Sequence, residues 1–164
     1  MCRKMLALYR DLLFLGIAGL LSFIWDVTTH KSKFAKCSQE IGACVLHLLH
    51  HFIFVFIAFS WLSNQREILI AELVLIVLVL GHWMTNDWQC FFTIKVDDMC
   101  DTKNSFKFVA NSIMDTNTWA KFFGFSSSTQ TDPVKRKRYS RIAQVVFLAV
   151  FFIICCFKLK KSTQ

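Results

Sequence analysis

Four apolar runs decide what this chain can fold into. Each contains 15 or more residues, and they cover residues 5–25, 41–62, 68–84 and 142–157. A soluble domain of 164 residues has no need of four such runs, whereas a helix that spans a bilayer requires about 20 apolar residues. In lipid, only helices and closed barrels satisfy all their backbone hydrogen-bonding groups. We therefore expect an all-α integral membrane bundle of about four transmembrane helices.

The runs also divide the chain into parts. We expect the helices at roughly 8–25, 41–62, 67–84 and 142–158. We expect residues 1–84 to form an N-terminal membrane region of three helices and residues 85–134 to form a polar, partly amphipathic extramembrane insertion. Residues 135–164 would hold a polybasic segment and the last helix. The first run follows a short basic start like that of a signal peptide. Because no small-residue cleavage pattern closes this run, we expect an uncleaved helix.

Histidines gather in the second and third expected helices, where polar groups are costly and usually functional. A short polar turn at 63–67 makes these helices antiparallel neighbours, so positions whose numbers sum to about 129 lie at one depth. His47 and His82 meet this condition. Cys44 and His51 share the helix face of His47 at about 100° per residue. The candidate ligands of a tetrahedral metal site are therefore Cys44, His47, His51 and His82.

Other interpretations of these histidines stay open. A haem would be held by His47 and His82 from opposite sides. The His47-x-x-His50-His51 string also matches one box of membrane di-iron enzymes, but five histidines in the whole chain are too few for that site. Proton handling is a further alternative. We favour a neutral histidine network that hydrogen-bonds between helices.

Three other polar residues carry specific expectations. If the loop after the third helix faces an oxidising lumen, Cys90 and Cys100 are the candidates for a disulfide. Glu72 lies one turn into the third helix, at the opposite membrane face from His82. We expect it to be an exposed or snorkelling carboxylate.

The formal charge of +8 comes mostly from basic residues beside the apolar runs. Such residues anchor helices to anionic headgroups, each contributing about 1 kcal/mol. No base-reading module accompanies them, so we expect no specific nucleic-acid binding. The membrane-surface anchors expected around the last helix are Lys135, Arg136, Lys137, Arg138, Arg141, Lys158, Lys160 and Lys161.

A scattered pattern runs through residues 47–100. It consists of His47-x-x-His50-His51, Trp61, His82-Trp83-x-Thr85-Asn86, Cys90-x-x-Thr93 and Cys100. The pattern resembles a small uncharacterised family of multi-span membrane proteins encoded by large DNA viruses of algae and amoebae. The resemblance implies a viral protein of an internal virion membrane or a host-derived membrane, and it supplies no catalytic residues.

No phosphate-binding loop, Ser–His–Asp set, HExxH or GxGxxG motif occurs, so we do not expect an enzyme. We expect a structural or interaction protein without a cofactor, such as a minor capsid protein of a virion membrane. Its partners would be the lipid bilayer and a capsid or other membrane proteins, and it could form an oligomer. One alternative is a redox protein that binds zinc or haem through the histidines above. The other is a small pore or transporter subunit.

Overall fold

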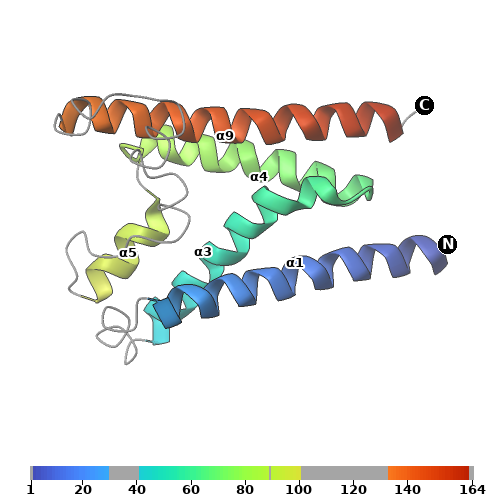
Figure 1. The fold of residues 1–164 in the computed structure, drawn as a ribbon, viewed down its shortest axis with the longest axis horizontal. Helices are drawn as coiled ribbons and strands as arrows, with labels where there is room; N and C mark the ends of the chain where they lie inside the picture. The colour runs from blue at the N-terminus through green and yellow to red at the C-terminus, as the bar shows by residue number, and fades with distance from the viewer. Residues whose placement is uncertain (1, 30–40, 89, 101–132, 163–164) are drawn as a thin grey trace.

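The computed structural model describes residues 2–29, 41–88, 90–100 and 133–162, and these residues form helices without a strand (Figure 1). The elements are α1 (Cys2–Thr29), α3 (Ile41–Phe59), the 3-10 helix η1 (Ser60–Leu62), α4 (Arg66–Thr85), α5 (Phe91–Met99) and α9 (Pro133–Ser162). Four segments of the described chain are long and apolar enough to cross a membrane: Lys4–Thr29, Ile41–Leu62, Arg66–Thr85 and Arg141–Lys161. The predicted all-α fold with four membrane-length helices is confirmed.

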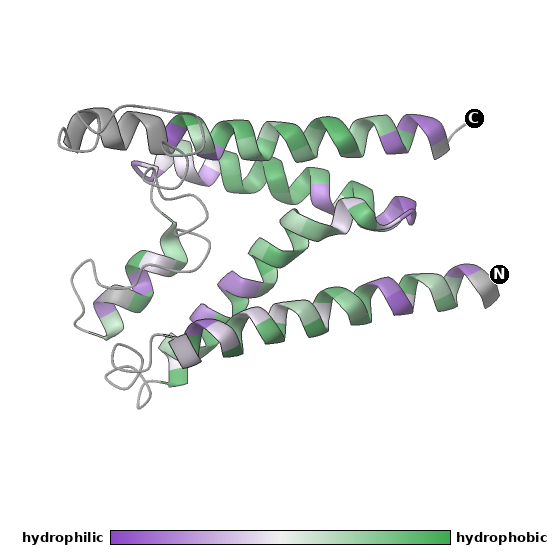
Figure 2. Cartoon of the chain, viewed as in Figure 1, coloured by the Kyte–Doolittle hydropathy of each residue, from purple (hydrophilic) through white to green (hydrophobic). Residues whose placement is uncertain are grey.

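The outer surface of the helices is apolar. Leu21, Leu78 and Phe157 are each at least 60% exposed, and many other large apolar side chains are exposed as well. Figure 2 shows α4 and α9 hydrophobic along most of their length, with hydrophilic residues near their ends. A surface of this kind is unfavourable in water and suited to hydrocarbon.

The helices pack in two pairs. α3 lies against α1, and α4 lies against α9. α3 and α4 meet at the η1 turn and then diverge, so that their other ends are far apart in Figure 1. α5 packs against α3 in this opening.

Apolar contacts inside the molecule form three small clusters. The cluster between α3 and the end of α5 has the buried members Ala43, Val96 and Cys100. The cluster among α1, α3 and α4 has Leu15, Val55 and Ile68. The cluster among α3, α4 and α9 has Ile57, Ile76 and Leu148. Because the clusters are small, the helices are held together more by close approach between them than by a large apolar core.

Gly19 allows α1 to approach α3 closely. A β-carbon at this position would lie 2.5 Å from Cδ1 and 3.2 Å from Cγ of Phe52, so the ring could not stay in place. Gly16, one turn earlier on α1, has nothing within 4 Å of the same position. Of these two glycines, Gly19 is the one that packing requires.

We predict that Gly19→Leu destabilises the bundle, whereas Gly16→Leu does not. Overpacking at such a contact costs about 1–3 kcal/mol, while replacing a helical glycine that has open space around it, such as Gly16, gains up to about 1 kcal/mol. The midpoint of unfolding by SDS in mixed micelles measures both effects. Equal midpoints for the two variants would contradict the close approach at Gly19.

Candidate functional site

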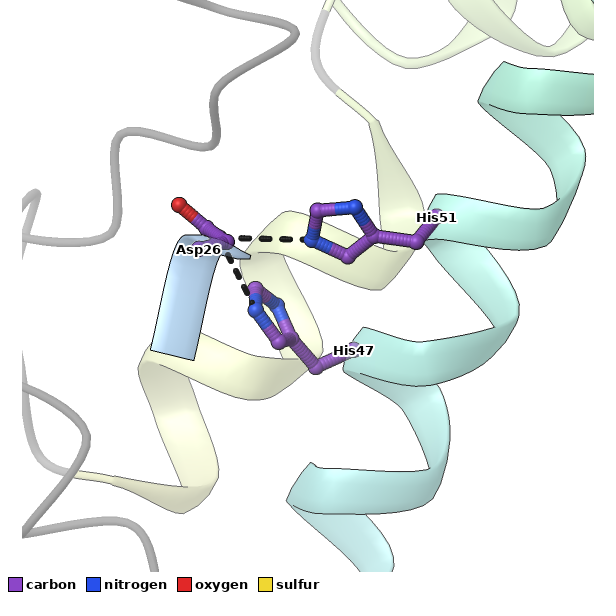
Figure 3. A group of neighbouring side chains, drawn as sticks. All are labelled: Asp26, His47 and His51. Carbon is purple, nitrogen blue, oxygen red and sulfur yellow. Dashed lines mark hydrogen bonds and ion pairs between the residues drawn. The ribbon is translucent and has the colours of Figure 1, made fainter. Parts of the chain in front are cut away.

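Three buried polar side chains meet between α1 and α3. Nε2 of His47 lies 3.0 Å from Oδ2 of Asp26, and Nε2 of His51 lies 3.3 Å from the same oxygen. All three side chains are at most 3% exposed. Figure 3 shows both imidazoles, from one side of α3, directed at the Asp26 carboxylate on α1. We call this group the Asp–His–His cluster.

The spacing of these residues explains how the cluster forms. His47 and His51 are four residues apart and therefore lie one above the other on one face of α3. Ser22 and Asp26 have the same spacing on α1, and Ser22 Oγ lies 2.8 Å from Nδ1 of His51. The Phe23 ring packs against both imidazoles, with ring centroids 5.4 and 5.9 Å away. Two matching polar faces thus meet where the helices pack.

Hydrogen bonding in the cluster suits a neutral His51. Its Nε2–H can donate to the Asp26 carboxylate while Nδ1 accepts the Ser22 hydroxyl proton, because a neutral imidazole has one donor and one acceptor nitrogen. The cluster can therefore act as a polar clamp between two helices. The favoured prediction of an interhelical histidine network agrees with this geometry, although the partner helix is α1 rather than α4.

The other two histidines of the membrane helices contact the start of α5. The backbone N–H of Phe91 donates to Nε2 of His82 over 3.0 Å. His50 Nε2 lies 3.8 Å from Cys90 Sγ, and the His50 ring stacks on Phe92. Helix N-termini leave N–H groups without intrahelical partners, so His82 satisfies one of these groups from a neighbouring helix.

The structure brings together only part of the ligand set proposed from the sequence. His47 and His51 converge, but the third ligand atom within 4.8 Å comes from Asp26. His82 points its nitrogen to α5, and Cys44 is a half-buried cysteine outside this group, with no disulfide. The equal-depth argument holds only near the turn, because α3 and α4 diverge beyond it. The same divergence removes the geometry of a haem held between His47 and His82.

Asp26 was missed by the sequence reasoning because the first helix was expected to end at residue 25. The helix continues to Thr29, which places Asp26 one turn before its end and on the face that meets α3. The Ser22–Asp26 spacing, which repeats that of His47–His51, was the signal that could have identified it.

The predicted Cys90–Cys100 disulfide does not form. Cys90 is a free cysteine, whereas Cys100 is disulfide-bonded. The two residues flank α5, a helix of nine residues, and therefore lie about 15 Å apart at 1.5 Å per residue. A disulfide requires α-carbons within about 7 Å. Burial raises the pKa of the Cys90 thiol despite hydrogen bonds from the start of α5.

Glu72 is fully buried, which corrects the expectation of an exposed carboxylate. The Cys155 thiol of α9 donates a hydrogen bond to Oε2 of Glu72 over 2.9 Å. α9 covers this face of α4, and the sequence pattern could not show which helix would do so. The contact thus fastens α4 to α9 with a polar bond.

Lys158 is one of the expected surface anchors, but it contacts protein. Its Nζ donates to the carbonyl oxygens of Trp61 and Ser63, each over 2.7 Å. The Ser63 hydroxyl donates in turn to Asp11 on α1 over 2.6 Å. Lys158 therefore ties the end of α9 to the turn between α3 and α4, while Lys161 is exposed.

The remaining residues expected to anchor the chain at the membrane surface differ in their burial. Arg141 is partly buried, with its guanidinium 5.9 Å from the centroid of the Trp88 ring. Lys160 is exposed at the other end of α9. The side chains of Lys135, Arg136, Lys137 and Arg138 lie outside the described part of the chain, as do the aromatic residues between 106 and 125.

We predict that Lys158→Met destabilises the protein by about 3 kcal/mol or more, because it removes two hydrogen bonds of a charged group, each contributing about 1.5–3 kcal/mol. Lys161→Met is the matched control on the same helix and should change stability little. SDS-induced unfolding of both variants measures the difference. A loss of stability that is the same for both would show that the bonds to the turn carbonyls do not matter.

No family model, curated protein or solved structure matches the chain. The resemblance to a viral membrane protein family therefore has only the sequence pattern in its favour and stays a prediction. The contacts described above are the remaining grounds for a functional proposal.

Proposed function

We propose that the chain is a structural membrane protein that presents a basic helical projection to an acidic protein surface. The observation that carries this proposal is the length of α9. The helix runs without a break from Pro133 to Ser162, but its long apolar run begins only after Arg141. Residues 133–140 therefore continue the helix beyond the span by about 12 Å.

This projection contains the most basic sequence of the chain. Lys135, Arg136, Lys137 and Arg138 follow one another there. Pro133 stands at the first position of the helix, where a proline costs no intrahelical hydrogen bond. The four basic residues lie about 4–9 Å along the helix from Arg141. Three of the four lie within one Debye length of Arg141, about 8 Å, and therefore still interact with anionic headgroups there.

The contacts inside the bundle support a structural role. Cys155 fastens α9 to α4, Lys158 fastens it to the turn, and the Asp–His–His cluster joins α1 to α3. Polar bonds of this kind hold membrane helices in a defined arrangement. The projection is thus attached to a bundle whose helices are held together by polar bonds, rather than to a single isolated helix.

The partner and the membrane remain those expected from the sequence. A capsid or another membrane protein with an acidic surface fits the charge of the projection, and complementary charge favours recognition. A virion membrane or a host-derived membrane is the location implied by the resemblance.

Site-specific photo-crosslinking tests the proposal. A photoreactive aromatic residue in place of Tyr139 should form a covalent adduct with an acidic protein in the membranes where the chain is made. Changing Lys135, Arg136, Lys137 and Arg138 together to Glu should reduce the adduct about tenfold or more, since each lost charge contact weakens binding.

The matched control changes Lys160 and Lys161 to Glu at the other end of α9 and should leave the adduct unchanged. Adducts with lipid alone, or a protein adduct that survives the reversal at 135–138, would refute a docking role for the projection.

A further inference from the structure

The Asp–His–His cluster has the dimensions of a metal site. With metal–ligand bonds of about 2.0–2.1 Å, ligand atoms of a tetrahedral ion lie roughly 3.3 Å apart. The two distances from Oδ2 of Asp26 to the histidine nitrogens are 3.0 and 3.3 Å. All three atoms lie within 4.8 Å of one another. Small side-chain movements would bring them around one ion.

The residues behind the ligands also suit a metal. A metal-bound histidine usually donates its second ring N–H to a neighbouring acceptor, which fixes the orientation of the ring. Ser22 Oγ stands 2.8 Å from Nδ1 of His51 and can fill this role. A hydroxyl group can donate or accept, so the same contact serves His51 both with and without an ion.

Charge gives a reason for an ion to bind here. The Asp26 side chain is 3% exposed, and it lies in a segment apolar enough to span a membrane. A carboxylate in such surroundings is costly unless a positive charge is close. A divalent cation among two imidazoles and one carboxylate would supply that charge and would be held by all three groups.

We propose that Asp26, His47 and His51 together bind one divalent first-row transition-metal ion between α1 and α3. The donor set is two imidazole nitrogens and one carboxylate oxygen, without a thiolate. Zinc(II) and iron(II) are the common ions for such a set, whereas soft thiolate sites select copper(I). Asp26 takes the place that Cys44 and His82 hold in the ligand set proposed from the sequence.

Metal analysis of the full-length protein tests the proposal first. Protein purified in detergent without chelator should contain about one zinc or iron ion per chain, and elemental analysis tells the two apart. After chelation, cobalt(II) serves as the probe, because its visible absorption reports nitrogen and oxygen ligands. Titration should saturate at the same stoichiometry.

Single substitutions identify the ligands. Asp26→Asn, which keeps the shape of the side chain, and His51→Ala should each abolish stoichiometric cobalt binding. His50→Ala is the matched control, because His50 lies between the two ligands on α3 but contacts Cys90, just before α5, and Phe92 in α5. It should bind cobalt like the unchanged protein.

Ser22→Ala keeps the inference testable if a ligand variant fails to fold. It leaves all three ligands in place and should weaken cobalt binding about 10–100-fold, the usual effect of losing a hydrogen-bond partner of a metal-bound histidine. Size-exclusion chromatography and far-UV circular dichroism show whether each variant keeps the fold. Zinc should also raise the melting temperature of the unchanged protein and of His50→Ala.

Two results would overturn the proposal. One is folded, unchanged protein that binds neither zinc nor cobalt. The other is binding that survives Asp26→Asn and His51→Ala but is lost in Cys44→Ala or His82→Ala, since this would assign the ion to the set proposed from the sequence.

Discussion

In a bilayer, apolar side chains gain little by leaving lipid for protein, so helix association depends on close packing and on hydrogen bonds between helices. The bundle follows this constraint. Its buried apolar clusters are small, and many of its large apolar side chains are exposed. Each described helix pair with extensive contact also has a polar bond: Asp26 with His47 for α1 and α3, and Glu72 with Cys155 for α4 and α9.

The polar groups fall into two regions. The Asp–His–His cluster and His50, which contacts the start of α5, lie around the first half of α3, while Lys158 and Ser63 lie at the turn that follows its other end. Both regions combine side chains from helices far apart in the sequence. An arrangement fixed at both ends of α3 is more specific than apolar contact alone would make it, because polar groups bond only particular partners.

The sequence predicted the number of membrane-length helices and the two histidines of the cluster, because length and helical periodicity are local properties. It did not predict the partner of those histidines. Asp26 contributes from α1, and its role depends on which helices become neighbours, which no local pattern states. The expectation that 41–62 and 68–84 are antiparallel neighbours with equal depths along their length was wrong beyond the turn. Glu72 shows the same limit, since its burial results from contact with α9.

The length of α9 has a mechanical consequence. A helix of 30 residues is a rod of about 45 Å, and this one carries the basic projection near Pro133 and the Lys158 contact near its other end. A force that tilts or turns the projection on one side of the membrane is therefore transmitted along a stiff lever to the turn between α3 and α4 on the other side. A partner that binds residues 133–140 would therefore exert force on Ser63 and Trp61 through α9 without contacting them.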